Sequence, residues 1–425
     1  MLTIKKTTLS NKVRIVTVPM RSTEAVTVMI MVRAGSRHET KDINGISHFL
    51  EHMFFKGGKR FPDPHAVAEA IDSVGGVFNA FTDNEFAGYY VKVAKEHIDT
   101  AFDVLSDMLL NAQFDQEGLE RERGVILEEY KMMHDDPKLL VGDAFEKVMF
   151  GEHPLGRSVI GLPQVIKRVK RADFLRYKNK LYTAANIVVS VAGNTSLAEV
   201  AKLTNRYLPF ARSTKQSQPL PYHEAERKAR INLVDRKTEQ AHLVLGVPTF
   251  GSRHRDRYVA KVLSAILGGG MSSRLFMSVR ERHGLAYYVY SDSANYVDTG
   301  YLAVHAGVDK QRIDLAMKTI LEEFTKLTRE LVSQKELKKA KEYLIGHLVL
   351  AMEDSDAVAM RLGLQELLDN RMETVADIKQ KVKAVTAEQI RSLARRIFTP
   401  NALTLAVIGP YSNRKKFVRL LRQLR

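Results

Sequence analysis

Two histidines and a glutamate lie close together in the segment His48-Phe49-Leu50-Glu51-His52. His48 and His52 are four residues apart, so on an α-helix both imidazoles lie on one face and can reach the same metal ion. Glu51 lies beside that pair, where its carboxylate can act on a water molecule bound to the ion. Hydrolysis by a zinc ion needs three protein ligands, an open position for water and a base. These residues therefore offer two ligands and the base.

The residues around this motif predict a helix. Asn44-Gly45 indicates a loop before it, and Ser47 is of a residue type that caps helix starts. Apolar side chains then recur at helical spacing, which predicts one buried face: Ile46, Phe49, Leu50, Met53 and Phe54. Two interpretations of the histidines stay open, a metal site or core histidines that are satisfied by hydrogen bonds.

A third ligand must come from elsewhere in the chain. The sequence has no cysteine, which excludes a Cys-rich structural zinc site. The segment from Asp115 to His134 predicts a long amphipathic helix, in which Glu122 and Glu129 are seven residues apart on one face. Such a pair beside an apolar stripe is costly unless a cation is present. The alternative is a solvated acidic helix face that binds no ion.

The composition is that of a soluble globular protein. The 425 residues suffice for two or three domains, and 45% hydrophobic with 27% charged residues is ordinary for this class. No apolar run approaches the length of a membrane span, and the amino terminus lacks the pattern of a signal peptide. The absence of cysteine is compatible with a reducing cytosol. We therefore expect a cytoplasmic protein that does not interact with membranes.

The formal net charge of +16 raises the question of nucleic-acid binding. The basic residues are scattered over predicted helices, and no zinc-finger, RRM or KH signature is present. We therefore expect no nucleic acid among the partners of this protein.

The chain repeats itself at a spacing of 216 residues. Residues 178–194 resemble residues 394–410 at this offset, and further segments match at nearly the same offset. A constant offset over several segments indicates a duplicated domain. We expect two homologous domains at residues 1–211 and 228–425, joined by a polar linker at residues 212–227.

Each half of the chain has strands first, then helices, then a final strand and helix. In the first half, residues 25–32 and 88–93 have strand patterns, and residues 95–134 have a helical pattern. This order predicts the α+β class, with two homologous domains. Each domain would be an antiparallel β-sheet that is covered by α-helices on one face. The corresponding region of the second half, residues 255–280, has no H-x-x-E-H motif, so we expect one site per chain.

The motif and its surroundings resemble the pitrilysin/insulinase-type inverted zinc metallopeptidases, in particular their mitochondrial and bacterial processing peptidases. The motif reverses the H-E-x-x-H order of the common zinc proteases. The resemblance covers essentially the whole chain, and it is carried by residues 45–61, 78–86, 122–132, 153–161 and 272–290.

The resemblance implies a complete zinc site in the first domain. Glu129, which lies 77 residues after His52 (129 − 52 = 77), would be the third zinc ligand, and Glu122 would be the nearby carboxylate that assists the site. Glu51 would be the general base.

The resemblance also implies contacts with the substrate. The strand around Asn79, Ala80 and Phe81 would pair with the substrate backbone. Arg280 and Tyr287, which are seven residues apart in the second domain, would stabilise the oxyanion of the transition state.

The implied function is that of a zinc-dependent endopeptidase that cleaves extended or unfolded peptides, leader peptides among them. Its two domains would form a processing-peptidase-like clamp, and the chain would work as a homodimer, with a heterodimer with a related subunit as the alternative. The basic net charge departs from the acidic cleft expected of an enzyme for basic leader peptides. The alternative function is a non-catalytic peptide-binding or structural core subunit, for which a damaged motif would be expected.

Overall fold

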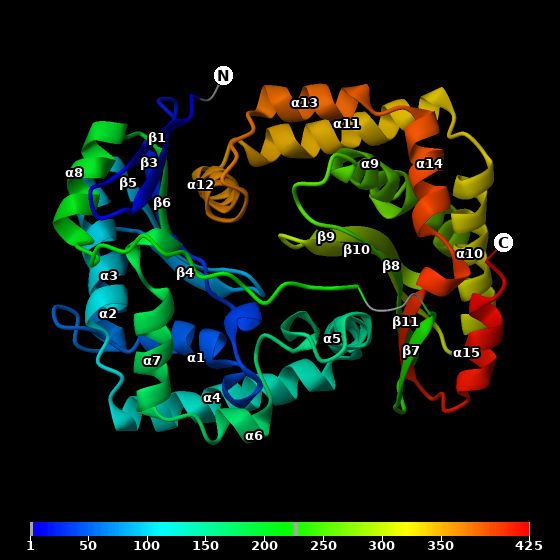
Figure 1. Ribbon diagram of the computed structural model, residues 1–425, viewed down its shortest axis with the longest axis horizontal. Coiled ribbons are helices and arrows are strands. Elements are labelled where there is room, and N and C mark those ends of the chain that lie inside the picture. Colours follow the sequence, from blue (N-terminus) through cyan, green and yellow to red (C-terminus); the bar gives the residue numbers. More distant parts are fainter. Residues whose placement is uncertain (1–2, 225–227, 425) are drawn as a thin grey trace. The chain divides into compact units, whose positions relative to one another are not determined.

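The computed structural model describes residues 3–224 and 228–424, and its contacts divide the chain into two compact units (Figure 1). Unit 1 comprises Met1–Lys131, Arg157–Leu220 and Leu350–Thr374, and unit 2 comprises Met132–Gly156, Pro221–Val349 and Val375–Arg425. Within the predicted linker, residues 225–227 lie outside the described residues, and residues 212–224 contain no helix or strand.

Unit 1 contains a sheet of six strands in the order β1-β2-β6-β3-β5-β4. The strands are β1 (Lys5–Thr8), β2 (Arg14–Pro19), β3 (Ala25–Val32), β4 (Val77–Thr82), β5 (Ala87–Ala94) and β6 (Ile187–Gly193). The last strand, β6, inserts between β2 and β3, where it runs parallel to β2 and antiparallel to β3. The sheet is therefore mixed, which corrects the expectation of a purely antiparallel sheet.

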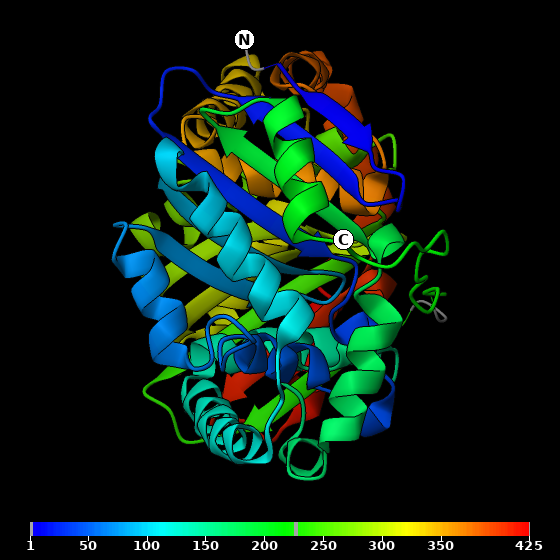
Figure 2. The same cartoon turned by 90° about the vertical axis from the view of Figure 1, so that its left-hand side faces the viewer.

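Helices cover both faces of this sheet, not one face as expected. Every residue of β6 is buried, which agrees with its nearly continuous apolar sequence IVVSVAG. Figure 2 shows α3 (Ile98–Asn111) and α8 (Leu197–Tyr207) in front of the strands. On the other face, α12 (Ser355–Leu364) packs against β3 and β6.

Unit 2 repeats this topology with five strands in the order β7-β11-β8-β10-β9. They are β7 (Arg230–Asp235), β8 (Gln240–Phe250), β9 (Ala286–Asn295), β10 (Thr299–Asp309) and β11 (Thr404–Gly409). When β2 to β6 are matched in chain order with β7 to β11, the two sheets have the same strand order and the same parallel pair. The shared topology agrees with the prediction of a duplicated domain.

The helices follow the repeat as well. α7 (Arg171–Leu181) corresponds to α14 (Ala387–Ile397), and both helix boundaries differ by the predicted offset (387 − 171 = 397 − 181 = 216). The remaining helices are α1 (Ile46–Phe54), α2 (Pro64–Asp72), α4 (Gln116–Asp135), α5 (Pro137–Phe150), α6 (Pro163–Ile166), α9 (Arg257–Gly268), α10 (Ile313–Arg329), α11 (Gln334–Ala351), α13 (Val375–Ala384) and α15 (Arg414–Leu421). In the described part of the chain, no helix is both long and apolar enough to cross a membrane.

One helix from each half of the sequence packs in the compact unit that the other half mainly forms. α5 comes from the first half but packs in the core of unit 2, where Phe145 and Met149 lie among residues of β8, β10 and β11. α12 comes from the second half but packs on the sheet of unit 1, where the Ser355 hydroxyl lies 2.8 Å from that of Thr27. The compact units therefore differ from the predicted division at residues 212–227 by these two segments.

Candidate metal centre

The helix α1 carries the histidine motif. Its predicted apolar stripe is buried, including Phe49 and Leu50, which confirms the expected buried face. The predicted capping role of Ser47 is wrong, because the helix is capped by Gly45 and Ser47 lies inside the first turn. The Ser47 hydroxyl instead lies 2.5 Å from the Tyr177 hydroxyl of α7.

The three predicted ligands lie together in unit 1. The Nε2 atoms of His48 and His52 are 3.6 and 3.5 Å from the two carboxylate oxygens of Glu129 on α4. Two ligands about 2.1 Å from a tetrahedral zinc ion are roughly 3.4 Å apart, so these separations suit a shared ion. Among the described residues, this is the one group of His, Cys, Asp or Glu side chains that could hold a metal.

Glu122 does not join this group but contacts one of its members. Its Oε2 atom lies 3.1 Å from Nδ1 of His52, and its Oε1 atom accepts a bond from Lys56 Nζ at 2.6 Å. With its proton on Nδ1, His52 keeps the lone pair of Nε2 toward Glu129. Metal-binding histidines are commonly oriented by a carboxylate in this way. Lys56 lies just beyond the end of α1 at Phe54, and its position four residues after His52 is the signal for it in the sequence.

The charges around the histidines favour a cation. Burial lowers the pKa of His48 to about 4, so this imidazole is neutral and able to bind a metal. Burial also lowers the pKa of His52, but the hydrogen bonds with Glu122 and Glu129 outweigh this effect and raise it to about 9. The negative field that favours a proton on His52 also favours a divalent ion in its place. The donor set of two imidazoles and one carboxylate is one that zinc uses in hydrolytic sites.

Glu51 lies beside the ligands and contacts the edge of the sheet. Its Oε2 atom accepts a hydrogen bond of 2.5 Å from the hydroxyl of Thr82, the last residue of β4. Burial raises the pKa of the Glu51 carboxyl, and the Thr82 hydroxyl opposes that shift. A raised carboxyl pKa suits a group that must take up and release a proton near neutral pH.

The predicted substrate strand is β4, which includes Asn79, Ala80 and Phe81. It is the edge strand of the sheet in unit 1 and pairs only with β5 among the described strands. An edge strand offers unpaired backbone N–H and C=O groups to an extended chain. Because Thr82 at the end of β4 contacts Glu51, this edge leads to the candidate metal centre.

Arg280 and Tyr287 belong to unit 2, whereas the three ligands belong to unit 1. Arg280 lies in the π-helical segment Phe276–Arg282, with its guanidinium 4.9 Å from the centre of the Phe276 ring. Tyr287 lies on β9 and is 78% exposed, so its hydroxyl is accessible. Their contribution to the metal centre stays a prediction.

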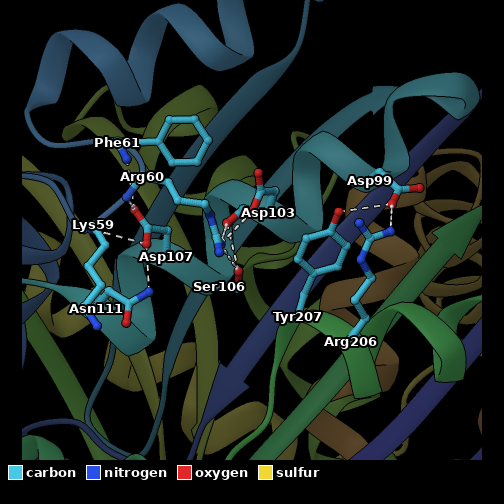
Figure 3. Close-up of polar contacts among 10 residues, drawn as sticks. All are labelled: Lys59, Arg60, Phe61, Asp99, Asp103, Ser106, Asp107, Asn111, Arg206 and Tyr207. Carbon is cyan, nitrogen blue, oxygen red and sulfur yellow. Dashed lines mark hydrogen bonds and ion pairs between the residues drawn. The ribbon is translucent and has the colours of Figure 1, made fainter.

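The loop that follows α1 is anchored by Asp107 of α3 (Figure 3). This fully buried carboxylate accepts backbone N–H bonds from Lys59, Arg60 and Phe61 at 3.2, 2.8 and 3.0 Å. The Asn111 amide donates a further bond of 2.8 Å. Sequence reasoning missed this anchor because it joins segments that are 46 to 48 residues apart.

Two protein-family models match most of the chain. Residues 14–162 match the model described as insulinase (peptidase family M16), and this range contains all of the candidate metal-site residues. Residues 168–344 match the model described as the peptidase M16 inactive domain.

The chain is similar to several bacterial proteins that are named uncharacterized zinc proteases. It is 38% identical over 413 residues to YmxG of Bacillus subtilis, with 96% of this chain and 99% of the relative covered. It is 36% identical over 419 residues to SCO5738 of Streptomyces coelicolor, with 97% of this chain and 91% of the relative covered. These names agree with zinc as the predicted cofactor.

Solved structures show the same fold. A protease from Helicobacter pylori superimposes with a TM-score of 0.91 at 24% identity, covering 96% of this chain and 100% of that chain. A chain of Complex III2 from Candida albicans superimposes with a TM-score of 0.85 at 19% identity, covering 99% of this chain and 100% of that chain. At these identities the likeness establishes the fold alone.

Proposed function

Since the chain belongs to the insulinase family of peptidases, family M16, we propose that it is a zinc-dependent endopeptidase that cleaves extended peptides. The observation that carries this proposal is the convergence of His48, His52 and Glu129, with the carboxylate of Glu51 beside them. A damaged or dispersed motif would favour a structural role. Here every residue type needed for the reaction is in place.

The proposed mechanism assigns a role to each side chain in unit 1. His48, His52 and Glu129 would hold the ion, while Glu122 fixes the orientation of the His52 ring. A bound zinc ion would supply a Lewis acid that lowers the pKa of water. Glu51 accepts the proton of the attacking water and passes it to the amine of the departing peptide.

The proposed substrate is an extended peptide that adds as a strand to the β4 edge at Asn79, Ala80 and Phe81. Backbone hydrogen bonds dominate such binding, so the enzyme accepts many sequences but requires unfolded chain. Leader peptides meet this requirement. The net charge of +16 argues against a preference for strongly basic ones.

We assign the second domain a supporting role. Arg280 and the accessible hydroxyl of Tyr287 would donate hydrogen bonds to the oxyanion of the transition state. The resemblance to processing peptidases supports a homodimer as the working form, and the absence of cysteine is compatible with a location in the cytoplasm.

The alternative function is a non-catalytic subunit, and the Complex III2 chain carries the same fold. The two functions are separated by incubating the purified protein with a quenched-fluorescence peptide library, before and after chelator treatment and zinc restoration. A peptidase cleaves the library, stops when zinc is removed and recovers when it returns. If the zinc-restored protein cleaves no peptide, the alternative function is correct.

A further inference from the structure

The zinc-motif helix α1 has no side-chain cap of its own. Its N-cap residue is Gly45, which has no polar side chain and a left-handed φ of 96°. The first backbone N–H groups of a helix have no partner within the helix and need an acceptor from elsewhere. In α1 this first turn includes His48, so its position bears on the metal centre.

Glu39 supplies the acceptor from outside the helix. This residue is only 4% exposed, and its Oε2 atom accepts from the Gly45 N–H at 2.7 Å and the Asn44 side chain at 2.9 Å. Its Oε1 atom accepts from the Ser47 N–H at 2.8 Å. Both carboxylate oxygens are therefore committed to the helix start, and their negative charge lies at the positive end of the helix dipole.

The loop between Glu39 and α1 is also fixed from its other side. A Cβ atom at Gly161 would lie 2.4 Å from the Asn44 carbonyl oxygen, and one at Gly45 would lie 2.6 Å from the Ile160 carbonyl oxygen. The Asn44 side chain donates to the Ser158 carbonyl at 3.2 Å. The backbone of residues 44–45 therefore packs directly against that of residues 160–161. This packing fixes the position of the Glu39 carboxylate relative to the start of α1.

We propose that Glu39 is a positioning residue for the metal centre, whose carboxylate caps α1 and thereby orients His48, Glu51 and His52. α1 has only nine residues, so a change in its first turn moves the helix as a unit. All three functional side chains of the helix would shift relative to Glu129 on α4. The inference rests on the proposed function only in requiring that the site binds zinc.

The substitution Glu39→Gln tests the cap with little change in side-chain size. The Gly45 and Ser47 N–H groups bond to different carboxylate oxygens, and glutamine replaces one of these oxygens with an amide group, which would face a backbone N–H and cannot accept from it. Asp107→Asn is the matched control. Asp107 is a buried carboxylate that also accepts backbone N–H bonds at both oxygens, but it holds Lys59 to Phe61, beyond the end of α1 at Phe54.

The measurements are zinc affinity by competition with a chromophoric chelator, the visible spectrum of the Co²⁺-substituted protein, kcat and KM for a quenched peptide, and the Tm of the zinc-free protein. For Glu39→Gln we expect zinc affinity to fall about 10- to 100-fold with an altered Co²⁺ spectrum. We also expect kcat to fall at least ~10-fold while KM stays within about twofold. For Asp107→Asn we expect a lower Tm, zinc affinity within about twofold of the wild type and an unchanged spectrum.

Wild-type zinc affinity and kcat in Glu39→Gln would overturn the proposal. So would an equal loss of zinc affinity in both variants, because that result would indicate general destabilisation. If Glu39→Gln does not fold, Glu39→Asp decides, since its shorter side chain withdraws the carboxylate from the Gly45 and Ser47 N–H groups, and unchanged zinc affinity there contradicts the proposal. If the wild type binds zinc but cleaves no peptide, the proposed function fails, and the zinc affinities still decide the role of Glu39.

Discussion

At the scale of single residues, the two glutamates of α4 have different roles. Glu129 lies against the Nε2 atoms of both histidines, whereas Glu122 lies against Nδ1 of His52 and the ammonium of Lys56. The two carboxylates are seven residues apart on one helix face, so the sequence pattern alone could not tell which one is the ligand. The histidine atom that each carboxylate contacts distinguishes their roles. Glu129 faces the Nε2 atoms and would be a direct ligand, whereas Glu122 faces Nδ1 and orients His52.

Zinc binding should therefore respond differently to the two substitutions. We expect Glu129→Gln to abolish stoichiometric zinc binding, because a ligand is lost. Glu122→Gln should weaken zinc binding about 10- to 100-fold, because only the orientation of His52 is affected. Metal analysis of dialysed protein and chelator competition measure both effects.

Glu128→Gln is the matched control, because Glu128 is the exposed neighbour of Glu129 and pairs with Lys131. It should bind zinc as the wild type does. Loss of zinc from Glu122→Gln but not from Glu129→Gln would show that the ligand has been assigned to the wrong glutamate.

At the scale of helices and loops, Asp107 predicts how the protein responds to acid. Burial alone raises the pKa of this carboxyl, but the N–H groups of Phe61 and Arg60 and the Asn111 amide hold it below its ordinary value of 3.8. Because the pKa is lower in the folded than in the unfolded state, the ionised carboxylate stabilises the fold above about pH 4. This stabilisation is lost as the pH falls through the folded-state pKa.

The Tm difference between the wild type and Asp107→Asn should therefore be largest near neutral pH and should shrink below about pH 4. Thermal melts of the two zinc-free proteins across this range measure it. Asp72→Asn, at an exposed position of α2, should show no such trend. A Tm difference that stays constant down to pH 2 would contradict the assigned role of Asp107.

The packing of α12 on the sheet of unit 1 gives a second prediction at this scale. A Cβ atom at Gly363 would lie 2.4 Å from the Met31 sulfur and 3.0 Å from Ser190 Cβ, so Gly363→Leu should destabilise the protein by about 1–3 kcal/mol. Gly346→Leu in α11 is the control, because no atom lies within 4 Å of its Cβ position. Differential scanning calorimetry compares them, and equal Tm values for both variants would contradict this packing.

Local patterns predicted the helices that carry the site, but not the contacts that hold them. The period of the apolar residues indicated α1, and the segment 115–134 matches α4 closely. The cap from Glu39, the insertion of β6 beside β2 and the exchange of α5 and α12 were missed. The insertion of β6 and the placement of α5 and α12 depend on pairing between distant segments, which leaves no periodic signal in either one. Glu39 lies only six to eight residues before Gly45 and Ser47, but an acceptor that lies outside the helix follows no capping pattern in the sequence.

At the scale of the whole molecule, the two copies of the repeat differ in the residues that they carry. The sheets of the two units share one topology, yet α9, which follows β8 as α1 follows β3, contains no histidine. The first copy thus keeps the metal ligands. For the second copy we propose Arg280 and Tyr287 as oxyanion donors, and this proposal predicts a kinetic signature.

Tyr287→Phe should lower kcat about 10²-fold and leave zinc affinity unchanged, because an oxyanion donor acts in the transition state and not on the metal. Steady-state kinetics with a quenched peptide and chelator competition test this pair of outcomes. Tyr290→Phe, at another exposed position of β9, should keep wild-type kcat. Equal kcat in Tyr287→Phe and the wild type would remove Tyr287 from the chemistry.

The central claim is that Glu51 is the base of a zinc peptidase, and one comparison tests it most directly. Zinc-restored wild type and Glu51→Gln are assayed with the same quenched peptide, with metal content measured on the same samples. The account predicts that both proteins hold one zinc per chain while kcat of Glu51→Gln falls about 10²- to 10⁴-fold. Cleavage by Glu51→Gln at the wild-type rate, with zinc bound, would contradict it.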